Sequence, residues 1–490
     1  MNGRMIVRIL SHILWIEAVL MLPALILALA SGDGAALRGF LAAEAAALLA
    51  AGVFRLLSRG AKRRFYAREG MAVVGMSWVL MSLVGALPFF VSGRIPSYID
   101  ALFEIVSGFT TTGASILSDV EALGHALLLW RSFSHWIGGM GVLVFLLAII
   151  PTSGGADGFT LHILRAESPG PTVNKIVPRM KRSAEILYLI YCALTAVDIV
   201  ALLLARMPVF DAFCIAFGTA GTGGFGVLNT SCAAYTHAAQ NITTVFMLLF
   251  GVNFGLYYLL LLRSFKAVFR DEELRLYLGV IVLSIVAITV NVVGRTADTM
   301  ALPDAIRHAA FQVSSIITTT GYSTTDFDLW PNFSRAILLL LMLVGACGGS
   351  TGGGLKMVRA LLLLKGLRRN TLRVLRPNEV RIVRMNGSRV DEQTLANVNA
   401  YLSAYVIILL AGFLILSADR AGYSMLTNLS AVTATFNNIG PGLDAVGPTC
   451  CFGGYSALSK LVMTLGMLLG RLEIFPILAL FAPGTYKRSF

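Results

Sequence analysis

The chain has 490 residues, of which 57% are hydrophobic and only 13% are charged, and its mean hydropathy is +0.77. This composition lies far outside the range of soluble globular domains, so a soluble protein is excluded. The formal net charge is +13, from 39 Lys and Arg against 26 Asp and Glu. Whether that charge marks a nucleic-acid partner or a membrane topology depends on where the basic residues lie along the chain.

Ten stretches of 18 or more residues with almost no charge recur along the chain. Each is close to the ~20 residues that a helix needs to cross the bilayer core, so the sequence predicts ten membrane-spanning helices. The first stretch exceeds the about 7–15 apolar residues of a signal peptide and contains Glu17, so we expect it to stay as a span. The ten stretches are Met5–Ala30, Ala36–Phe54, Met71–Gly93, His125–Ile150, Ala184–Ala205, Thr243–Leu262, Leu274–Val293, Ile337–Leu364, Ala396–Leu416 and Leu458–Phe481.

The basic residues gather on one side of the predicted membrane. With a cytoplasmic N-terminus, segments 1–8, 55–70, 151–184, 263–275, 355–395 and 485–490 are cytoplasmic and hold 29 of the 39 Lys and Arg. This is the positive-inside pattern, so the net charge reports topology and we expect no nucleic-acid partner. The other side carries acidic residues that would attract cations. They are Asp100, Asp119, Glu121, Asp211, Asp304, Asp326, Asp328 and Asp444.

A short unit recurs after the third, fifth, seventh and ninth predicted spans. "DALFEIVSGFTTTGAS" (Asp100–Ser115) and "DAFCIAFGTAGTGGFG" (Asp211–Gly226) both place an aspartate 13 residues before a glycine. "IITTTGYS" and "ATFNNIGPG" repeat the same ending at Gly321 and Gly440. The unit is a helix, a short half-helix, a Thr/Asn-Gly turn and a second helix, and it occurs four times.

Each half-helix, expected at about ten residues, is too short to span the bilayer and must enter it and return. Non-helical backbone at that depth is tolerated only where it lines a wet cavity. Four such turns around one axis would present carbonyl oxygens that can replace the hydration shell of a cation. Glycine lets the four segments crowd the axis, and threonine adds a hydroxyl that can hold the turn or help to coordinate an ion. A single TTTG is more typical of a polar hairpin tip, but four copies in register favour an ion filter.

Two further features interrupt the apolar spans. "GGSTGGGLK" (Gly348–Lys356) superficially resembles a phosphate-binding loop, but it lacks the GxxxxGK[ST] pattern and a preceding strand. Its five glycines instead break a helix, which requires a cavity. Arg471 lies in the last span, where an unpaired charge costs at least about 2.5–3.5 kcal/mol. Two interpretations remain open. Arg471 has a structural role, through a buried ion pair with Glu473 or through carbonyl contacts that lock the bundle, or it faces the pore below the filter, is held by carbonyl groups of the glycine run and repels a waiting cation.

These features resemble the membrane subunit of the Trk/Ktr/HKT family of potassium transporters, and most of all its bacterial Trk branch. The resemblance covers nearly the whole chain, from an extra N-terminal pair of helices to the last span, and its motifs are highly specific. His135 departs from it, because most relatives have glutamine there, and we expect this to affect only local packing. The other matching stretches are "WRSFSHWIGGMG" (Trp130–Gly141), "GVNFG" (Gly251–Gly255), "GACGGSTGGGLKMVR" (Gly345–Arg359) and "GRLEIFPIL" (Gly470–Leu478).

The resemblance implies an all-α integral membrane protein with four pseudo-symmetric helix–pore-loop–helix repeats around one pore. The expected units are an N-terminal helix pair at 1–60 and repeats at 61–152, 153–265, 266–365 and 366–490. Gly113 favours potassium, because relatives that pass sodium often have serine there. The implied potassium-binding filter residues are Thr111, Thr112, Gly113, Thr222, Gly223, Gly224, Thr319, Thr320, Gly321, Asn438, Ile439 and Gly440.

The resemblance also assigns the glycine run to an intramembrane loop that blocks passage below the filter until it moves. It further implies a homodimer in the cytoplasmic (inner) membrane, with both termini in the cytoplasm. A cytoplasmic ring of nucleotide-binding subunits, of NAD or ATP type, would dock on the basic loops. The resemblance implies that potassium is the transported ion, and we expect no organic cofactor in this chain. The implied gate residues are Gly345, Gly348, Gly349, Gly352, Gly353, Gly354, Lys356 and Arg471.

Two other classes of function were weighed against potassium uptake. A sodium- or proton-coupled secondary transporter also uses discontinuous helices, but such folds usually show two halves and not four parallel quarters. An intramembrane enzyme would need a nucleophile and a base, and Ser107 or Ser134 with His135 lacks a third partner at helical spacing. We therefore expect no enzyme activity.

Overall fold

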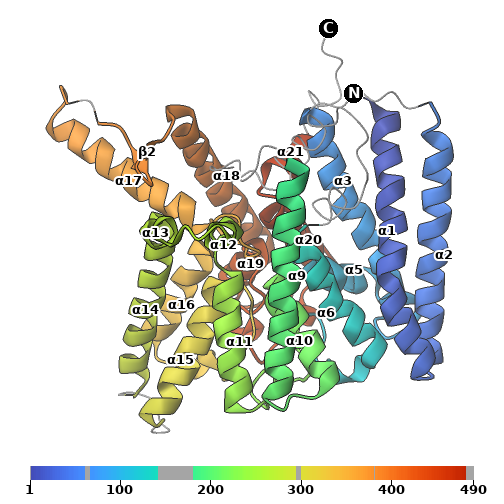
Figure 1. Cartoon of the computed structure of the whole chain (residues 1–490). Helices are drawn as coiled ribbons and strands as arrows, with labels where there is room; N and C mark the ends of the chain where they lie inside the picture. The colour runs from blue at the N-terminus through green and yellow to red at the C-terminus, as the bar shows by residue number, and fades with distance from the viewer. Residues whose placement is uncertain (1, 61–66, 142–179, 294–299, 380, 482–490) are drawn as a thin grey trace.

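The computed structural model describes residues 2–60, 67–141, 180–293, 300–379 and 381–481, and this part of the chain is almost wholly α-helical (Figure 1). Two short strands, β1 (Arg384–Met385) and β2 (Ser388–Arg389), pair antiparallel. Six helical stretches are long and apolar enough to cross a membrane, which confirms a polytopic helical membrane protein. They are α1 (Gly3–Ala30), α2 (Gly34–Leu57), α3 (Ala67–Gly85) with α4 (Leu87–Val91), α9 (Met180–Leu204), α14 (Glu272–Val293) and α18 (Glu392–Ser417).

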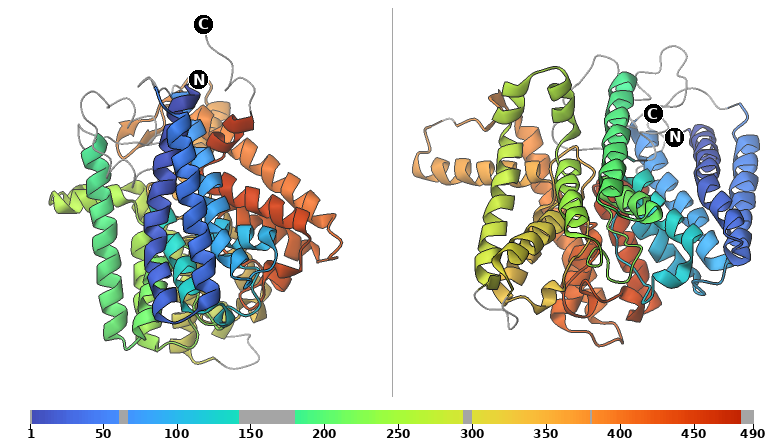
Figure 2. Two further views of the ribbon diagram at one scale, coloured as in Figure 1. Left: turned by 90° about the vertical axis from the view of Figure 1, so that its right-hand side faces the viewer. Right: turned by 60° about the horizontal axis from the view of Figure 1, so that its bottom comes forward.

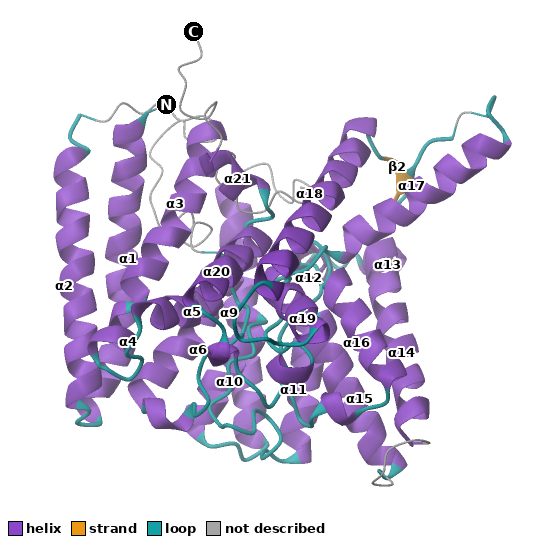
Figure 3. Cartoon of the chain, turned by 180° about the vertical axis from the view of Figure 1, so that it is seen from behind, coloured by secondary structure: helices purple, strands orange, loops and turns teal. Residues whose placement is uncertain are grey.

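Four short helices occupy the places of the predicted half-helices. They have 12 to 16 residues, slightly more than expected. At 1.5 Å per residue they reach roughly 18–24 Å, which is short of the ~30 Å bilayer core. The loops that follow them gather in the middle of the bundle (Figure 3). The four are α5 (Tyr98–Phe109), α10 (Val209–Gly221), α15 (Leu302–Ile317) and α19 (Met425–Phe436).

The helix that follows each half-helix is broken or shorter than the predicted span, and of these breaks only the one at the glycine run was predicted. α11 (His237–Phe250) and α12 (Phe254–Leu261) meet at an 89° bend. α16 (Asn332–Val344) and α17 (Met357–Leu375) are separated by the glycine loop, and α20 (Ala457–Arg471) and α21 (Phe475–Phe481) by three residues. α6 (His125–Gly139) ends early, and the rest of the predicted span to Ile150 lies outside the described residues. A hydropathy window averages over such breaks and cannot detect them.

The packing order closes the four repeats into a ring. The helix after each half-helix packs against the half-helix of the next repeat: α6 against α10, α11 against α15, α16 against α19, and α20 against α5. Because the last contact returns to the first repeat, all four turns face the same central region. The remaining short helices are α13 (Phe265–Arg270) and the 3₁₀ turns Glu121–Leu123, Phe327–Leu329, Asp444–Val446 and Phe452–Gly454.

The N-terminal helix pair stands at one side of this ring (Figure 2). α2 buries a face of Phe40 and alanines at helical spacing, and α1 packs against α2, α3 and α6. Outward-facing apolar side chains such as Leu49, which is 71% exposed, suit contact with lipid. Each helix of the pair carries one glutamate inside its apolar stretch, Glu17 on α1, which is fully buried, and Glu44 on α2, which is partly buried.

Candidate ion filter and gate

The four candidate filter segments, residues 111–113, 222–224, 319–321 and 438–440, share one backbone conformation. Their first residues lie in the left-handed region, with φ of 55° at Thr111, 54° at Thr222, 59° at Thr319 and 56° at Asn438. Their third residues are glycines with φ between 78° and 100°. The left-handed conformation costs a residue with a side chain about 1–2 kcal/mol. Its recurrence at four equivalent positions is typical of strain kept for function.

Each filter segment begins where its half-helix ends in the same hydrogen-bonded turn. The N–H of the middle residue donates to the carbonyl group five residues earlier, as in a Schellman motif. Hydroxyl pairs also hold two of the turns, because the Thr110 and Thr112 oxygens and the Thr318 and Thr320 oxygens are each 2.8 Å apart. The closing bonds are Thr112 to Ser107 (2.8 Å), Gly223 to Gly218 (2.8 Å), Thr320 to Ser315 (2.8 Å) and Ile439 to Ala434 (2.9 Å).

The glycine of each filter segment lies against the middle carbonyl group of the next segment, and the contacts close into a ring. Any Cβ added at these glycines would collide with that carbonyl oxygen, so no residue with a side chain fits without movement. The structure therefore brings all twelve predicted filter residues together. The distances from a Cβ to the oxygen would be 2.0 Å from Gly113 to Gly223, 1.9 Å from Gly224 to Thr320, 2.0 Å from Gly321 to Ile439 and 2.8 Å from Gly440 to Thr112.

The glycine loop, residues 345–356, touches the filter segments of the third and fourth repeats. The Gly353 N–H donates to the Thr319 hydroxyl at 2.7 Å. A Cβ on Gly353 would lie 2.4 Å from the carbonyl oxygen of Asn437, the residue just before the fourth filter segment. Lys356 closes the loop, because its ammonium group donates to the carbonyl oxygen of Gly352.

The same loop fills the break between α11 and α12 in the second repeat. The Cys347 N–H donates to the Gly251 carbonyl at 3.1 Å, and the Phe254 N–H donates to the Gly349 carbonyl at 3.1 Å. The Glu273 carboxylate accepts from the Gly348 N–H at 2.6 Å. The loop thus satisfies backbone groups that the broken helix leaves open.

Arg471 holds the glycine loop from the fourth repeat. Its guanidinium donates to the carbonyl groups of Thr351 and Gly139, both at 2.6 Å, and to that of Gly138. The alternative interpretation, an Arg471–Glu473 ion pair, is wrong, because the Glu473 carboxylate binds Arg359. One carbonyl partner, Thr351, belongs to the glycine loop and two belong to α6, so these contacts fit both carbonyl contacts that lock the bundle and an arginine that holds the loop.

Two buried ion pairs were missed in the sequence. Arg131 and Glu104 lie 2.6 Å apart, and Arg359 pairs with Glu473 while its guanidinium lies 4.0 Å from the centre of the Tyr401 ring. The first pair could have been suspected from the sequence, because Arg131 is a lone charged residue inside an apolar stretch. Arg359 gave no such signal, since it falls among the basic residues that indicate topology.

Three of the eight acidic residues on the predicted outer face are paired with basic groups. Asp100 lies 2.7 Å from Lys460, Asp304 2.7 Å from Arg307, and Asp328 3.2 Å from Arg335. The Ser424 and Thr427 hydroxyls donate to Asp444 and lower the pKa of its carboxyl group. Long-range attraction of cations by this face is accordingly weaker than its charge count suggests.

Half-helices too short to cross a bilayer, a closed ring of glycine turns and an arginine-held loop beside it define a class, the helical membrane proteins that transport ions. The comparisons with known proteins give the family. The chain belongs to the TrkH family of cation transport proteins, whose model matches residues 38–486.

Relatives match this chain along its whole length. It is 37% identical over 492 residues to the Trk system potassium uptake protein TrkH of Salmonella typhimurium, covering 99% of this chain and 100% of the relative. It is 34% identical to the protein of the same name from Halomonas elongata, with 100% of both chains covered. The crystal structure of the potassium transporter TrkH from Vibrio parahaemolyticus superposes with a TM-score of 0.87 at 33% identity, covering 99% of this chain and 100% of that one.

Proposed function

We propose that this chain takes up potassium ions across the cytoplasmic membrane through a pore on the axis of the filter ring. The observation that carries the proposal is the closed ring, in which four equivalent segments meet through glycine and carbonyl groups. Backbone carbonyl oxygens are the ligands that replace the hydration shell of potassium in filters. The relatives named as potassium uptake proteins support the same ion.

The twelve filter residues are the proposed potassium ligands, mainly through their carbonyl oxygens. Hydroxyl groups hold the frame, since those of Thr112 and Thr320 are engaged by neighbouring threonines. Gly113 keeps the first segment in close contact with the second, which supports selection of potassium over sodium.

The glycine loop with Lys356 and Arg471 is the proposed gate. Its contacts with Thr319, with the break after α11 and with the α6 carbonyl groups support a plug held by all four repeats. A loop fixed by hydrogen bonds, and not by apolar packing alone, can be released when one anchor moves.

The membrane is proposed to be the cytoplasmic one, with both termini inside. The start of α1 and the projecting helix α17 lie at the same end of the bundle (Figure 1), which supports a single basic cytoplasmic side. The proposed repeat limits after residues 265 and 365 fall inside α13 and α17, and the limit between 152 and 153 lies outside the described residues.

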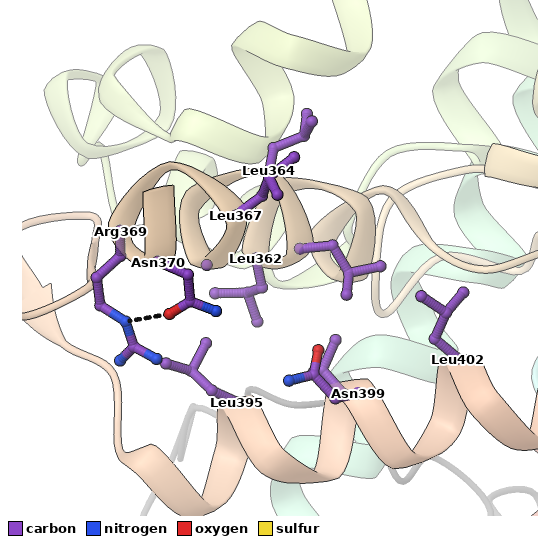
Figure 4. A pocket seen from close by; sticks show the side chains of 11 residues that line it. Leu362, Leu364, Leu367, Arg369, Asn370, Leu395, Asn399 and Leu402 are labelled. Atoms are coloured by element: carbon purple, nitrogen blue, oxygen red, sulfur yellow. Dashed lines mark hydrogen bonds between the residues drawn. The ribbon is translucent and has the colours of Figure 1, made fainter. Parts of the chain in front are cut away.

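A second copy of the chain and a ring of nucleotide-binding subunits are the proposed partners. α17 extends from the bundle with apolar side chains outward, including Leu367 at 65% and Val374 at 83% exposure. Beside it a groove of about 340 Å³ opens between α17 and α18, lined by Leu362, Leu395 and the polar Asn370 (Figure 4). Because α17 projects from the bundle at the end proposed to be cytoplasmic (Figure 1), its exposed apolar groups favour a protein partner over lipid.

Cysteine cross-linking tests the proposed dimer. In a Cys450→Ser background, Leu367→Cys should form an oxidised dimer in membranes, because α17 would meet its copy there. Leu49→Cys, 71% exposed on the far side of the bundle, is the matched control and should stay monomeric. Equal cross-linking of both variants would reject α17 as the dimer contact.

Flux into vesicles that contain this chain alone tests the function. We expect rubidium uptake that external potassium suppresses and external sodium does not, with none in protein-free vesicles. A potassium gradient at equal sodium and proton concentrations should drive the membrane potential to the potassium equilibrium value. A potential that shifts when a sodium or proton gradient is imposed would favour the alternative, a coupled secondary transporter.

A further inference from the structure

His135 of α6 lies wholly buried between the first and second repeats and contacts the backbone of both. Its Nδ1 is 2.7 Å from the carbonyl oxygen of Gly108, which lies in the last turn of α5. Its Nε2 is 3.2 Å from the backbone nitrogen of Phe225, the residue that follows the second filter segment. The imidazole therefore bridges the start of one filter segment and the end of the next.

The two partners fix the protonation state of the ring. The Gly108 carbonyl can only accept a hydrogen bond, so Nδ1 carries the proton, and the Phe225 N–H can only donate, so Nε2 keeps its lone pair. The charged groups that face the ring are Arg131 on its own helix and Arg471 on α20, and both repel a second proton. Because a doubly protonated ring would turn an N–H toward the Phe225 N–H, the bridge exists only with neutral imidazole.

The imidazole also occupies the space that a side chain at Gly223 would need. A Cβ on Gly223 would lie 2.2 Å from the ring's Cγ and 2.3 Å from Nδ1. Gly223 is the middle residue of its filter segment, and its carbonyl oxygen is the one that meets Gly113. The corresponding threonines, Thr112 and Thr320, are held by hydroxyl pairs, which glycine cannot form.

Arg131, one helical turn earlier, reinforces the same stretch of backbone. Its Nη1 donates to the Gly226 carbonyl at 3.0 Å, and its guanidinium lies 3.5 Å from the centre of the Phe225 ring. Its partner Glu104 accepts from the Ile116 N–H at 3.0 Å, just beyond the first filter segment. One face of α6 thus holds the backbone just after the first and the second filter segments.

We propose that neutral His135 is a positioning residue of the ion filter. Because Gly223 has no side chain to hold its own turn, His135 holds the second filter segment from α6 and keeps it in the geometry that selects potassium. The inference rests on the proposed function of the filter. It gives His135 a role beyond the local packing expected from the sequence.

Three variants of the full chain, purified and reconstituted in vesicles, test this role through the potassium to sodium permeability ratio. His135→Gln should keep the ratio within about twofold, because an amide can donate to Gly108 and accept from Phe225. His135→Leu keeps the bulk but loses both hydrogen bonds, and we expect the ratio to fall about tenfold. His125→Leu, an exposed histidine on the same helix, is the control and should not change the ratio. An unchanged ratio in folded His135→Leu, or an equal loss in His135→Gln, would overturn the proposal.

A compensation experiment provides a second test that does not depend on His135→Leu folding. Gly223→Ala should lower the ratio, because its Cβ meets the imidazole. Adding His135→Ala should restore part of the ratio, since the smaller side chain leaves room for that Cβ. Losses that simply add in the double variant would overturn the proposal. If Gly113→Ser also leaves the ratio unchanged, the filter assignment itself fails; if only the His135 and Gly223 variants lack effect, this inference alone fails.

Discussion

Replacing Gly113 by serine is the most direct perturbation of the filter ring. A Cβ at this position would lie 2.0 Å from the Gly223 carbonyl oxygen, whereas ordinary contact begins at 3.4 Å. The first and second filter segments must therefore separate by the difference of 1.4 Å, or the Gly223 carbonyl must turn away. Either change alters the position of a proposed potassium ligand. We expect discrimination against sodium to fall at least about tenfold, which corresponds to about 1.4 kcal/mol.

The assay is the ratio of potassium to sodium permeability in vesicles, which does not depend on the amount of folded protein. Serine at Gly113 also adopts an unfavourable backbone angle, since φ there is 79°. Gly93→Ser separates the two effects, because φ at Gly93 is 74° and no atom lies within 4 Å of its added Cβ. The control should keep the wild-type ratio. A wild-type ratio in Gly113→Ser would refute the assignment of this segment to the filter.

Three further predictions concern the gate, the buried ion pair and the topology. Arg471→Ala removes the contacts to Thr351 and α6 and should raise basal flux per folded molecule; flux at or below the wild-type level rejects the gate. Glu473→Ala leaves Arg359 buried without its partner and should lower stability by about 3–5 kcal/mol in thermal unfolding, with no change in ion selectivity. In a background without exposed native cysteine, a cysteine at Ser388 should react with reagent only from the cytoplasm and one at Ser118 only from outside; the reverse pattern contradicts the topology.

The positions of the candidate filter residues could be predicted because the same Thr/Asn and glycine pattern occurs four times in the sequence. Glycine is required at the third position of each segment by positive φ and by the approach of a neighbouring carbonyl group. This requirement can be seen in the sequence, because each segment has glycine at that position: Gly113, Gly224, Gly321 and Gly440. The left-handed φ at the first position is harder to predict from the sequence, because threonine adopts it in three segments and asparagine in the fourth.

The breaks in the helices that follow the half-helices could be predicted only where the sequence has a run of glycines. The glycine loop was predicted from its composition, but the break after α20 occurs at Glu473 and Ile474, which adopt φ of 55° and 67° although neither is glycine. That break depends on tertiary contacts, among them the pairing of Glu473 with Arg359 from another repeat. Local sequence carries no information about a partner 114 residues away.

The proposed filter and the proposed gate are in direct contact. The Gly353 N–H binds the hydroxyl of Thr319, and Gly353 also lies against Asn437 next to the fourth segment. Movement of the loop must therefore change the surroundings of the third and fourth filter segments. The first and second segments are held instead from α6, through Arg131 and His135, which belong to no part of the loop. We thus expect the third and fourth segments to differ more between the closed and the conducting state than the first and second, which feel the movement only through their contacts in the ring and through the hydrogen bonds of Arg471 to α6.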